Sequence, residues 1–201
     1  MTGQIPLVFH GHRWPAARAV SGVIMTTGDG RQWSAREARG FWRSFPEVDV
    51  NDDAAKAGWV QRYGDPLGEL APSRPIGTTL WKNVALVLAL FRDGWREPDQ
   101  DGISHARKDS SLQAEADLFV RGMDVRLIFE PNLRLAARCA HLHDYMLASA
   151  AFMLANKTPM RRCDQCGHWY GFQRRTGRFC SGECRSAAAR LRKDQGHVIS
   201  A

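Results

Sequence analysis

The sequence predicts an α+β protein with a mainly α-helical N-terminal domain, a small β-rich part at its start, and a small C-terminal unit built around four cysteines. Short apolar runs separated by turn residues fill the first thirty positions, amphipathic helical patterns follow, and four of the five cysteines lie between residues 163 and 184. A chain of 201 residues supports one core-forming domain plus a small module. We expect a ligand- or partner-binding domain over residues 1–157, the cysteine-rich unit over 158–195 and a flexible tail over 196–201.

The first fifty residues predict two short strands and one short helix. Pro6–Phe9 is an apolar run, and Val20–Thr27 has the composition of a strand that ends at a hairpin turn over Gly28–Gly30. Ser34–Glu37 has the capping-box pattern, a serine followed three positions later by a glutamate. A short helix is therefore expected from this point, ending before Pro46.

Two further helices are expected in the middle of the chain. Asn51–Asp53 offers capping side chains for a helix from Ala54 to Tyr63, and the glycines and prolines of residues 64–77 predict a loop after it. A threonine at position 78 or 79 can cap a second helix, whose apolar residues between Leu80 and Phe91 share one broad face. The polar stretch Asp93–Asp109 is expected to be a surface loop.

The second half of the domain predicts a helix over Ser110–Val120 and a strand over Val125–Phe129. Leu133–Ala155 is rich in alanine, leucine and methionine and is the longest helical pattern in the chain. Asn156–Pro159 is expected to end that helix and to mark the boundary of the domain.

The formal net charge is +7, and the positive excess lies near the C-terminus. Residues 157–193 hold ten lysines and arginines against two acidic residues, a net charge of +8, whereas the remaining positions hold 18 basic and 19 acidic residues. A near-neutral body with a basic C-terminal unit indicates two parts with different partners.

Several classes of protein are excluded by what the sequence lacks. No apolar run approaches the roughly 18 residues that a membrane span needs, so no membrane partner is expected. The first residues do not combine a basic segment with an apolar one, which favours a cytoplasmic protein without a secretory signal. No hydrolase, zinc-protease or phosphate-loop motif occurs, and His168 alone cannot supply the residues of a nuclease site. We expect no enzymatic activity.

The four clustered cysteines have the spacing of a zinc site. Cys163 and Cys166 form a C-x2-C pair, and Cys180 and Cys184 form a C-x3-C pair after thirteen intervening residues. Zinc binds four thiolates tetrahedrally, and a tight turn such as Gly167 allows brings both sulfurs of a pair to one ion. We therefore expect one structural Zn²⁺ with no open coordination position. Two disulfides are the alternative, which cytoplasmic proteins rarely contain.

The residues around the cysteines predict the form of this unit. Trp169–Phe172 and Arg178–Phe179 are expected to form the arms of a hairpin, and Ser181 is expected to cap a helix with Cys184 in its first turn. A turn carrying two ligands, a hairpin, and a ligand on the first turn of a helix together make a treble-clef zinc finger.

The expected last helix is slim and basic. Ala187–Ala189 favours a helix with a low profile, so the flanking arginines could reach the phosphates that border a nucleic-acid groove. Alternatively, the arginines only offset the negative charge of four thiolates around Zn²⁺, which would explain Arg162 and Arg178 but not the others. We expect contacts with nucleic acid, DNA before RNA, from six residues: Arg174, Arg175, Arg185, Arg190, Arg192 and Lys193.

The stretch from Cys163–Gly167 through Arg178–Arg185 to the basic helix resembles the C-terminal finger of the bacterial CGNR-type zinc-finger proteins. With the Leu/Ala-rich segment before the finger, the resemblance covers about residues 130–193. It implies a stress-induced transcription regulator with an α-rich ABATE domain at its N-terminus. The family's Gly-Asn-Arg falls here on Arg185–Ala187, so the chain resembles a divergent relative or another FCS-type treble clef of the same layout. The alternative function is a non-enzymatic subunit of a nucleoprotein complex that docks on RNA or protein.

A second metal site is a further candidate, on the expected long helix. Cys139 and His143 are four residues apart there, with His141 between them, and could share an ion. Two more ligands would have to come from elsewhere, and a lone helical cysteine is usually a small buried residue.

Overall fold

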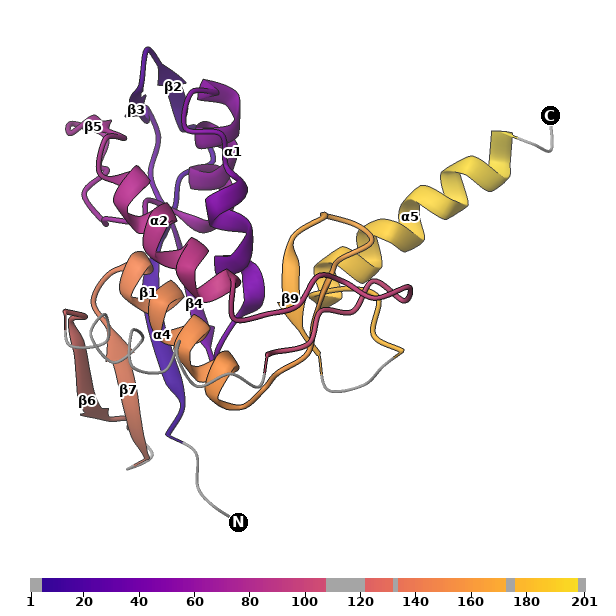
Figure 1. Cartoon of the computed structure of the whole chain (residues 1–201). Coiled ribbons are helices and arrows are strands. Elements are labelled where there is room, and N and C mark those ends of the chain that lie inside the picture. Colours follow the sequence, from indigo (N-terminus) through magenta and orange to yellow (C-terminus); the bar gives the residue numbers. More distant parts are fainter. Residues whose placement is uncertain (1–4, 108–121, 132–133, 173–175, 199–201) are drawn as a thin grey trace.

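The computed structural model describes residues 5–107, 122–131, 134–172 and 176–198, with side chains up to residue 192 in the last range. It is a mixed α/β protein in which a body of helices and sheets carries a smaller C-terminal unit, whose last helix projects away from the body (Figure 1). The helix expected over Ser110–Val120 lies outside the described residues. No helix in the described part of the chain is long and apolar enough to span a membrane.

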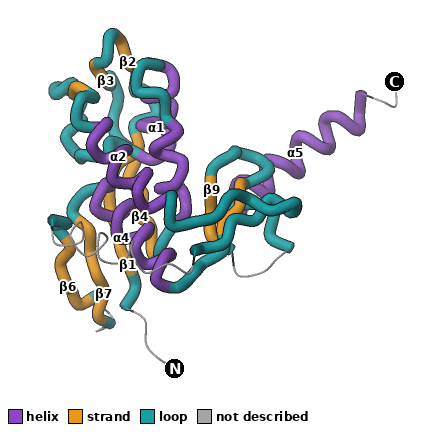
Figure 2. The backbone as a smooth tube through the Cα atoms, in the orientation of Figure 1, coloured by secondary structure: helices purple, strands orange, loops and turns teal. Residues whose placement is uncertain are grey.

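The larger sheet joins the start of the chain to residues more than a hundred positions later. Its strand order is β4-β1-β7-β6, with β1 parallel to β7 and the other neighbours antiparallel. Helix α4 packs against β1 and β7, the two central strands (Figure 2). The strands are β1 (Leu7–Arg13), β4 (Arg31–Arg36), β6 (Val125–Phe129) and β7 (Leu135–Cys139).

The strand expected over Val20–Thr27 is in fact two strands of a second sheet. Ser21 and Gly22 both have positive φ, 52° and 79°, as a two-residue hairpin turn requires. This turn joins β2 to β3, which then pairs with β5, whereas β4 pairs with β1. The hairpin expected at Gly28–Gly30 is therefore wrong, because the strands on either side belong to different sheets. The strands are β2 (Arg18–Val20), β3 (Val23–Met25) and β5 (Ile76–Gly77).

The first helix begins later than expected. Ser34 lies within β4, and the helix that follows is a 3₁₀ helix, η1 (Gly40–Glu47), which contains Pro46 near its end. The capping-box pattern was overridden by the pairing of this stretch with β1.

The next two helices are confirmed. Asp52 caps α1 (Asp53–Tyr63) through a 2.8 Å hydrogen bond accepted from the Ala54 N–H, and Gly64 follows the helix with a φ of 99°. Helix α2 (Trp81–Arg92) begins one residue after the expected apolar face does, and Leu80 at its start is exposed. Neither threonine before it caps it by a side-chain bond.

The long helix expected over Leu133–Ala155 is wrong in its first part. Leu135–Cys139 is the strand β7, and the helix α4 (Leu142–Ala155) begins only after His141. The Asp144 carboxylate accepts a 3.3 Å hydrogen bond from the His141 N–H, which fixes the start of the helix. Pairing with β1 and β6 decides the strand, because alanine-rich residues favour a helix where no neighbouring strand is available.

The hydrophobic core extends from the body into the C-terminal unit. Trp42, Trp81 and Tyr145 are completely buried in it, and Met160 and Trp169 belong to the same cluster. The stretch expected to be a surface loop, residues 93–109, contributes buried side chains where it is described. Its Ser104 pairs with Met160 through two backbone hydrogen bonds, of 2.8 and 2.9 Å.

The C-terminal unit consists of a hairpin and one long helix. Strands β8 (Met160–Arg162) and β9 (Trp169–Gly171) pair antiparallel, and α5 (Gly182–Val198) follows. The hairpin lies close to η1: a Cβ atom on Gly40 would stand 2.5 Å from the Tyr170 Cα, so only glycine fits there.

Candidate metal centre

The first cysteine pair lies on the turn between β8 and β9. Cys163 follows β8 directly, and the Gly167 N–H donates a 2.8 Å hydrogen bond to its carbonyl oxygen. Gly167 has a φ of 71°, a conformation that glycine adopts without strain, so the chain reverses at this point as the sequence predicts.

The second pair lies where α5 begins. The Cys184 N–H donates a 3.2 Å hydrogen bond to the Ser181 Oγ, which confirms Ser181 as the cap. Cys180 precedes this cap and Cys184 is in the first turn of the helix. The helix therefore holds one sulfur in place while the chain before it supplies the other.

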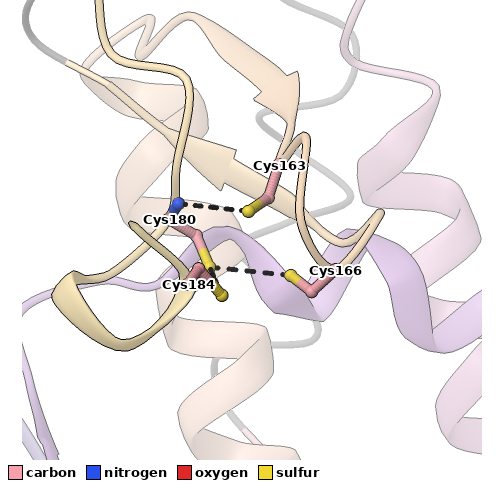
Figure 3. Close-up of side chains that lie close together, drawn as sticks. All are labelled: Cys163, Cys166, Cys180 and Cys184. Atoms are coloured by element: carbon pink, nitrogen blue, oxygen red, sulfur yellow. Dashed lines mark hydrogen bonds between the residues drawn. The ribbon is translucent and has the colours of Figure 1, made fainter. Parts of the chain in front are cut away.

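The four sulfur atoms converge on one point (Figure 3). All lie within 4.8 Å of one another, with Cys166 and Cys180 at 3.7 Å and Cys180 and Cys184 at 3.5 Å. Four thiolates bound at about 2.3 Å around a tetrahedral zinc ion are roughly 3.8 Å apart, so the cluster has the size of such a shell. All five cysteines are free thiols, so the two disulfides that were the alternative to a metal site are not formed. Cys163, Cys166, Cys180 and Cys184 could hold one metal ion.

Backbone N–H groups favour a thiolate at Cys163. Burial alone would raise its pKa, but hydrogen bonds from the backbone N–H groups of Cys180, Cys166 and Gln165 lower that pKa to about 7. The bond from the Cys180 N–H is 3.4 Å long (Figure 3).

The sulfurs disfavour ionisation of one another. Burial raises the pKa of Cys180, and the hydrogen bond with Cys184 and the nearby Cys166 and Cys163 raise it further. Burial likewise raises the pKa of Cys166. A bound divalent cation offsets this repulsion and allows all four thiols to ionise.

The body contributes one charged group that sequence reasoning missed. Arg62, in the last turn of α1, lies with its Nη2 atom 3.9 Å from the Cys184 Sγ. It is 122 positions away in sequence, so no local spacing connects it with the cysteines. Its guanidinium partly offsets the negative charge that four thiolates bring to the cluster.

His168 adds no positive charge beside the cysteines. Its ring packs against Tyr63 at 5.3 Å and Trp59 at 6.2 Å between ring centroids, both in edge-on geometry. Burial and then the nearby Arg62 lower its pKa to about 4. The imidazole is therefore neutral near pH 7 and acts as part of the contact between the hairpin turn and α1.

The hairpin differs from the one expected. Arg178–Phe179 is not a strand, and β9 pairs with β8 instead, because residues 160–162 offer an extended segment directly before the first cysteine. Arg178 nevertheless lies across from the turn, where its side chain pairs with Asp164 at 2.6 Å. The small apolar cluster around the cysteines does contain the expected aromatic rings of Tyr170, Phe172 and Phe179.

Some of the basic residues of this unit contact the protein itself, and others are exposed on α5. Arg162 pairs with Glu47 at 2.7 Å and Arg178 with Asp164, so both engage carboxylates of the protein. Arg185, Arg190 and Arg192 on α5 are exposed. Arg174 and Arg175 lie outside the described residues, as does the side chain of Lys193, whose backbone is in α5.

The second candidate metal site is not assembled. Cys139 lies in β7 whereas His143 lies on α4, so the helical spacing on which the candidate depended is absent. Burial raises the pKa of Cys139 to about 12, which favours the neutral thiol. Within the described ranges, the four clustered cysteines form the one group of three or more potential ligands.

No protein-family model, curated protein or solved structure matches this chain. Its function is therefore inferred from its own residues.

Proposed function

We propose that the C-terminal unit is a treble-clef zinc finger that binds one structural Zn²⁺ and that α5 contacts duplex DNA, as in a transcriptional regulator. The observation that carries the proposal is the projection of α5 away from the body with three arginines exposed along it (Figure 1).

Zinc is the metal that the donor set favours. Four thiolates are soft ligands, and a four-sulfur tetrahedral shell is typical of structural zinc. Because four protein ligands leave no position for water or substrate, the site would stabilise the fold and would not catalyse a reaction.

The arginines on α5 are exposed and, in contrast to Arg162 and Arg178, none of them pairs with a carboxylate among the described residues. The Arg192 Nε donates only to the Ala188 carbonyl of its own helix, at 3.3 Å. Arg185 and Arg192 are seven positions apart, so they share a helix face and are separated by about 10 Å along the axis. Ala187–Ala189 between them keeps the helix narrow, as a helix that enters the major groove must be. The resemblance to the CGNR-type regulators points to the same partner.

Metal analysis tests the zinc proposal. We expect about one zinc ion per purified chain, and we expect Cys166→Ala to lose it. Cys139→Ala is the matched control, since this cysteine lies outside the cluster and should leave the zinc content unchanged. A wild-type chain without zinc after gentle purification would show that the proposal is wrong.

Titration of duplex DNA at several salt concentrations tests the role of α5. We expect affinity to fall steeply with salt, and the double variant Arg185→Ala/Arg192→Ala to lower the magnitude of the salt slope by about two. Arg18→Ala/Lys82→Ala, which removes the same charge from exposed positions on the body, should leave the slope nearly unchanged. Equal slopes for the two double variants would contradict phosphate contacts by α5. A preference for structured RNA over duplex DNA would favour a nucleoprotein subunit instead.

A further inference from the structure

A cleft of about 1040 Å³ lies between the body and the C-terminal unit. The body side is formed by both ends of β1, by β4, η1 and the ends of α1 and α4, and the other side by β9 and the residues around the start of α5. Its volume is slightly above the usual range for small-molecule sites in proteins, about 300–1,000 Å³. A molecule in this cleft would touch both parts of the chain.

Aromatic rings line the body side of the cleft. Phe41 and Tyr63 stack at 4.4 Å between centroids with an interplanar angle of 11°, and Trp33 meets Phe41 edge-on at 6.3 Å. Across the cleft, β9 and the residue after it contribute Tyr170 and Phe172. Rings on both sides suit a flat ligand, because a planar group can pack against aromatic faces and edges.

Guanidinium groups also line the cleft. The lining contains three arginines, Arg13, Arg39 and Arg62, and two acidic residues, Glu37 and Glu183. Arg62 is engaged by the Cys184 sulfur, whereas Arg13 and Arg39 have no carboxylate partner among the described residues. A phosphate or carboxylate could accept charge-assisted hydrogen bonds from Arg39, which follows β4 at the Leu7 end of β1.

The Arg13 guanidinium lies 4.8 Å from the centroid of the Trp33 ring, so it already has an aromatic partner at its end of the cleft. Arg39 is exposed, which leaves its guanidinium open to an anionic group of a ligand.

We propose that this cleft binds a small aromatic anion of nucleotide size, with its ring against Trp33, Phe41 and Tyr63 and its anionic group on Arg39. The site is separate from the exposed arginines of α5, so its ligand binding does not require that α5 bind DNA. The same chemistry is available from a free nucleotide and from an unpaired nucleotide at the end of a nucleic-acid strand.

Calorimetric titration of the zinc-loaded full-length chain with the four common nucleoside monophosphates tests the proposal, with tryptophan fluorescence as a second readout. We expect at least one to bind, and the matching nucleoside and ribose 5-phosphate to bind at least about tenfold more weakly, because each lacks one half of the ligand. Arg39→Gln should weaken binding by about tenfold. Arg31→Gln, an exposed arginine on β4 outside the cleft, should not.

The source of the ligand is distinguished by a DNA hairpin with a single unpaired 3′ nucleotide. If the hairpin displaces the free nucleotide, a strand end can occupy the cleft. In that case Arg39→Gln should weaken binding of the hairpin end, whereas Arg185→Ala/Arg192→Ala should still show the displacement. If the hairpin does not compete although the free nucleotide binds, the occupant of the cleft is the free nucleotide. If no nucleotide binds at about 1 mM, or if the nucleoside binds as tightly as its phosphate, the proposal is wrong, whatever the DNA titration of α5 gives.

Discussion

Gly40 fixes how closely the C-terminal hairpin can approach the body. An alanine there would place its Cβ 2.5 Å from the Tyr170 Cα and 2.8 Å from the Gly171 N, both backbone atoms that cannot turn aside. We predict that Gly40→Ala lowers the free energy of unfolding by about 1–3 kcal/mol, as overpacking does. Urea denaturation followed by tryptophan fluorescence measures the change.

Gly58→Ala is the matched control for this prediction. It adds the same methyl group inside α1, where nothing lies within 4 Å of the new atom. This variant should be more stable than the wild type by about 0.5–1 kcal/mol, since alanine is the better helix former. Equal effects of the two substitutions would mean that the backbone approach at Gly40 is not tight.

The Arg62 side chain reaches from the body to the four-cysteine cluster. With zinc bound as proposed, the guanidinium near the Cys184 sulfur stabilises the negatively charged shell, and partners of this kind typically change metal affinity by 10–100-fold. We predict that Arg62→Ala lowers zinc affinity by about tenfold or more, measured by competition with a chromophoric chelator. Arg62→Lys keeps the charge, so its zinc affinity should lie between those of the wild type and Arg62→Ala. Unchanged affinity in Arg62→Ala would exclude this role.

At the scale of elements, the cap of α1 is a local signal with a measurable energy. The Asp52 side chain accepts a hydrogen bond from the Ala54 N–H at 2.8 Å. We predict that Asp52→Ala lowers the free energy of unfolding by about 1 kcal/mol, whereas Asp52→Asn, which can still accept the bond, changes it far less. Thermal unfolding of the three proteins measures the difference. A loss as large in the asparagine variant would assign the effect to charge instead of capping.

Elements with such local signals could be predicted from the sequence. The ends of α1, the turn at Gly167 and the Ser181 cap each depend on residues within a few positions of one another. The cysteine spacing likewise predicts the four-cysteine cluster. In each case the hydrogen bond or turn that decides the structure is formed by neighbours in the chain.

Elements decided by distant partners could not be predicted. Residues 135–139 have a helical composition but pair with β1, which lies some 130 positions earlier. Val20–Thr27 is divided by a turn, and the strand after that turn pairs with β5. The contact of Arg62 with the cysteines is of the same kind. A single sequence carries no signal for such contacts, because they depend on how the finished elements pack.

At the scale of the whole molecule, the body and the C-terminal unit share one hydrophobic core. Met160 and Trp169, which flank the first cysteine pair, are buried in the cluster of the body, and the Trp169 backbone N–H donates a 3.0 Å hydrogen bond to the Ser44 Oγ of η1. The Arg43 guanidinium lies 3.8 Å from the centroid of the Trp169 ring on the same side. The sequence predicts two separate units with a boundary near residue 157, and these contacts cross that boundary.

If zinc binds as proposed, its removal should therefore destabilise more than the C-terminal unit. The hairpin that carries Cys163 and Cys166 also supplies Trp169 to the core, so loss of the metal would loosen the packing of η1. We predict a single unfolding transition in calorimetry, shifted to lower temperature by a chelator and restored by added zinc. The matched measurement is Cys166→Ala, which should melt at the temperature of the chelated wild type with or without zinc. Two transitions, with the temperature of the larger one unchanged by the chelator, would show that the body and the C-terminal unit fold independently.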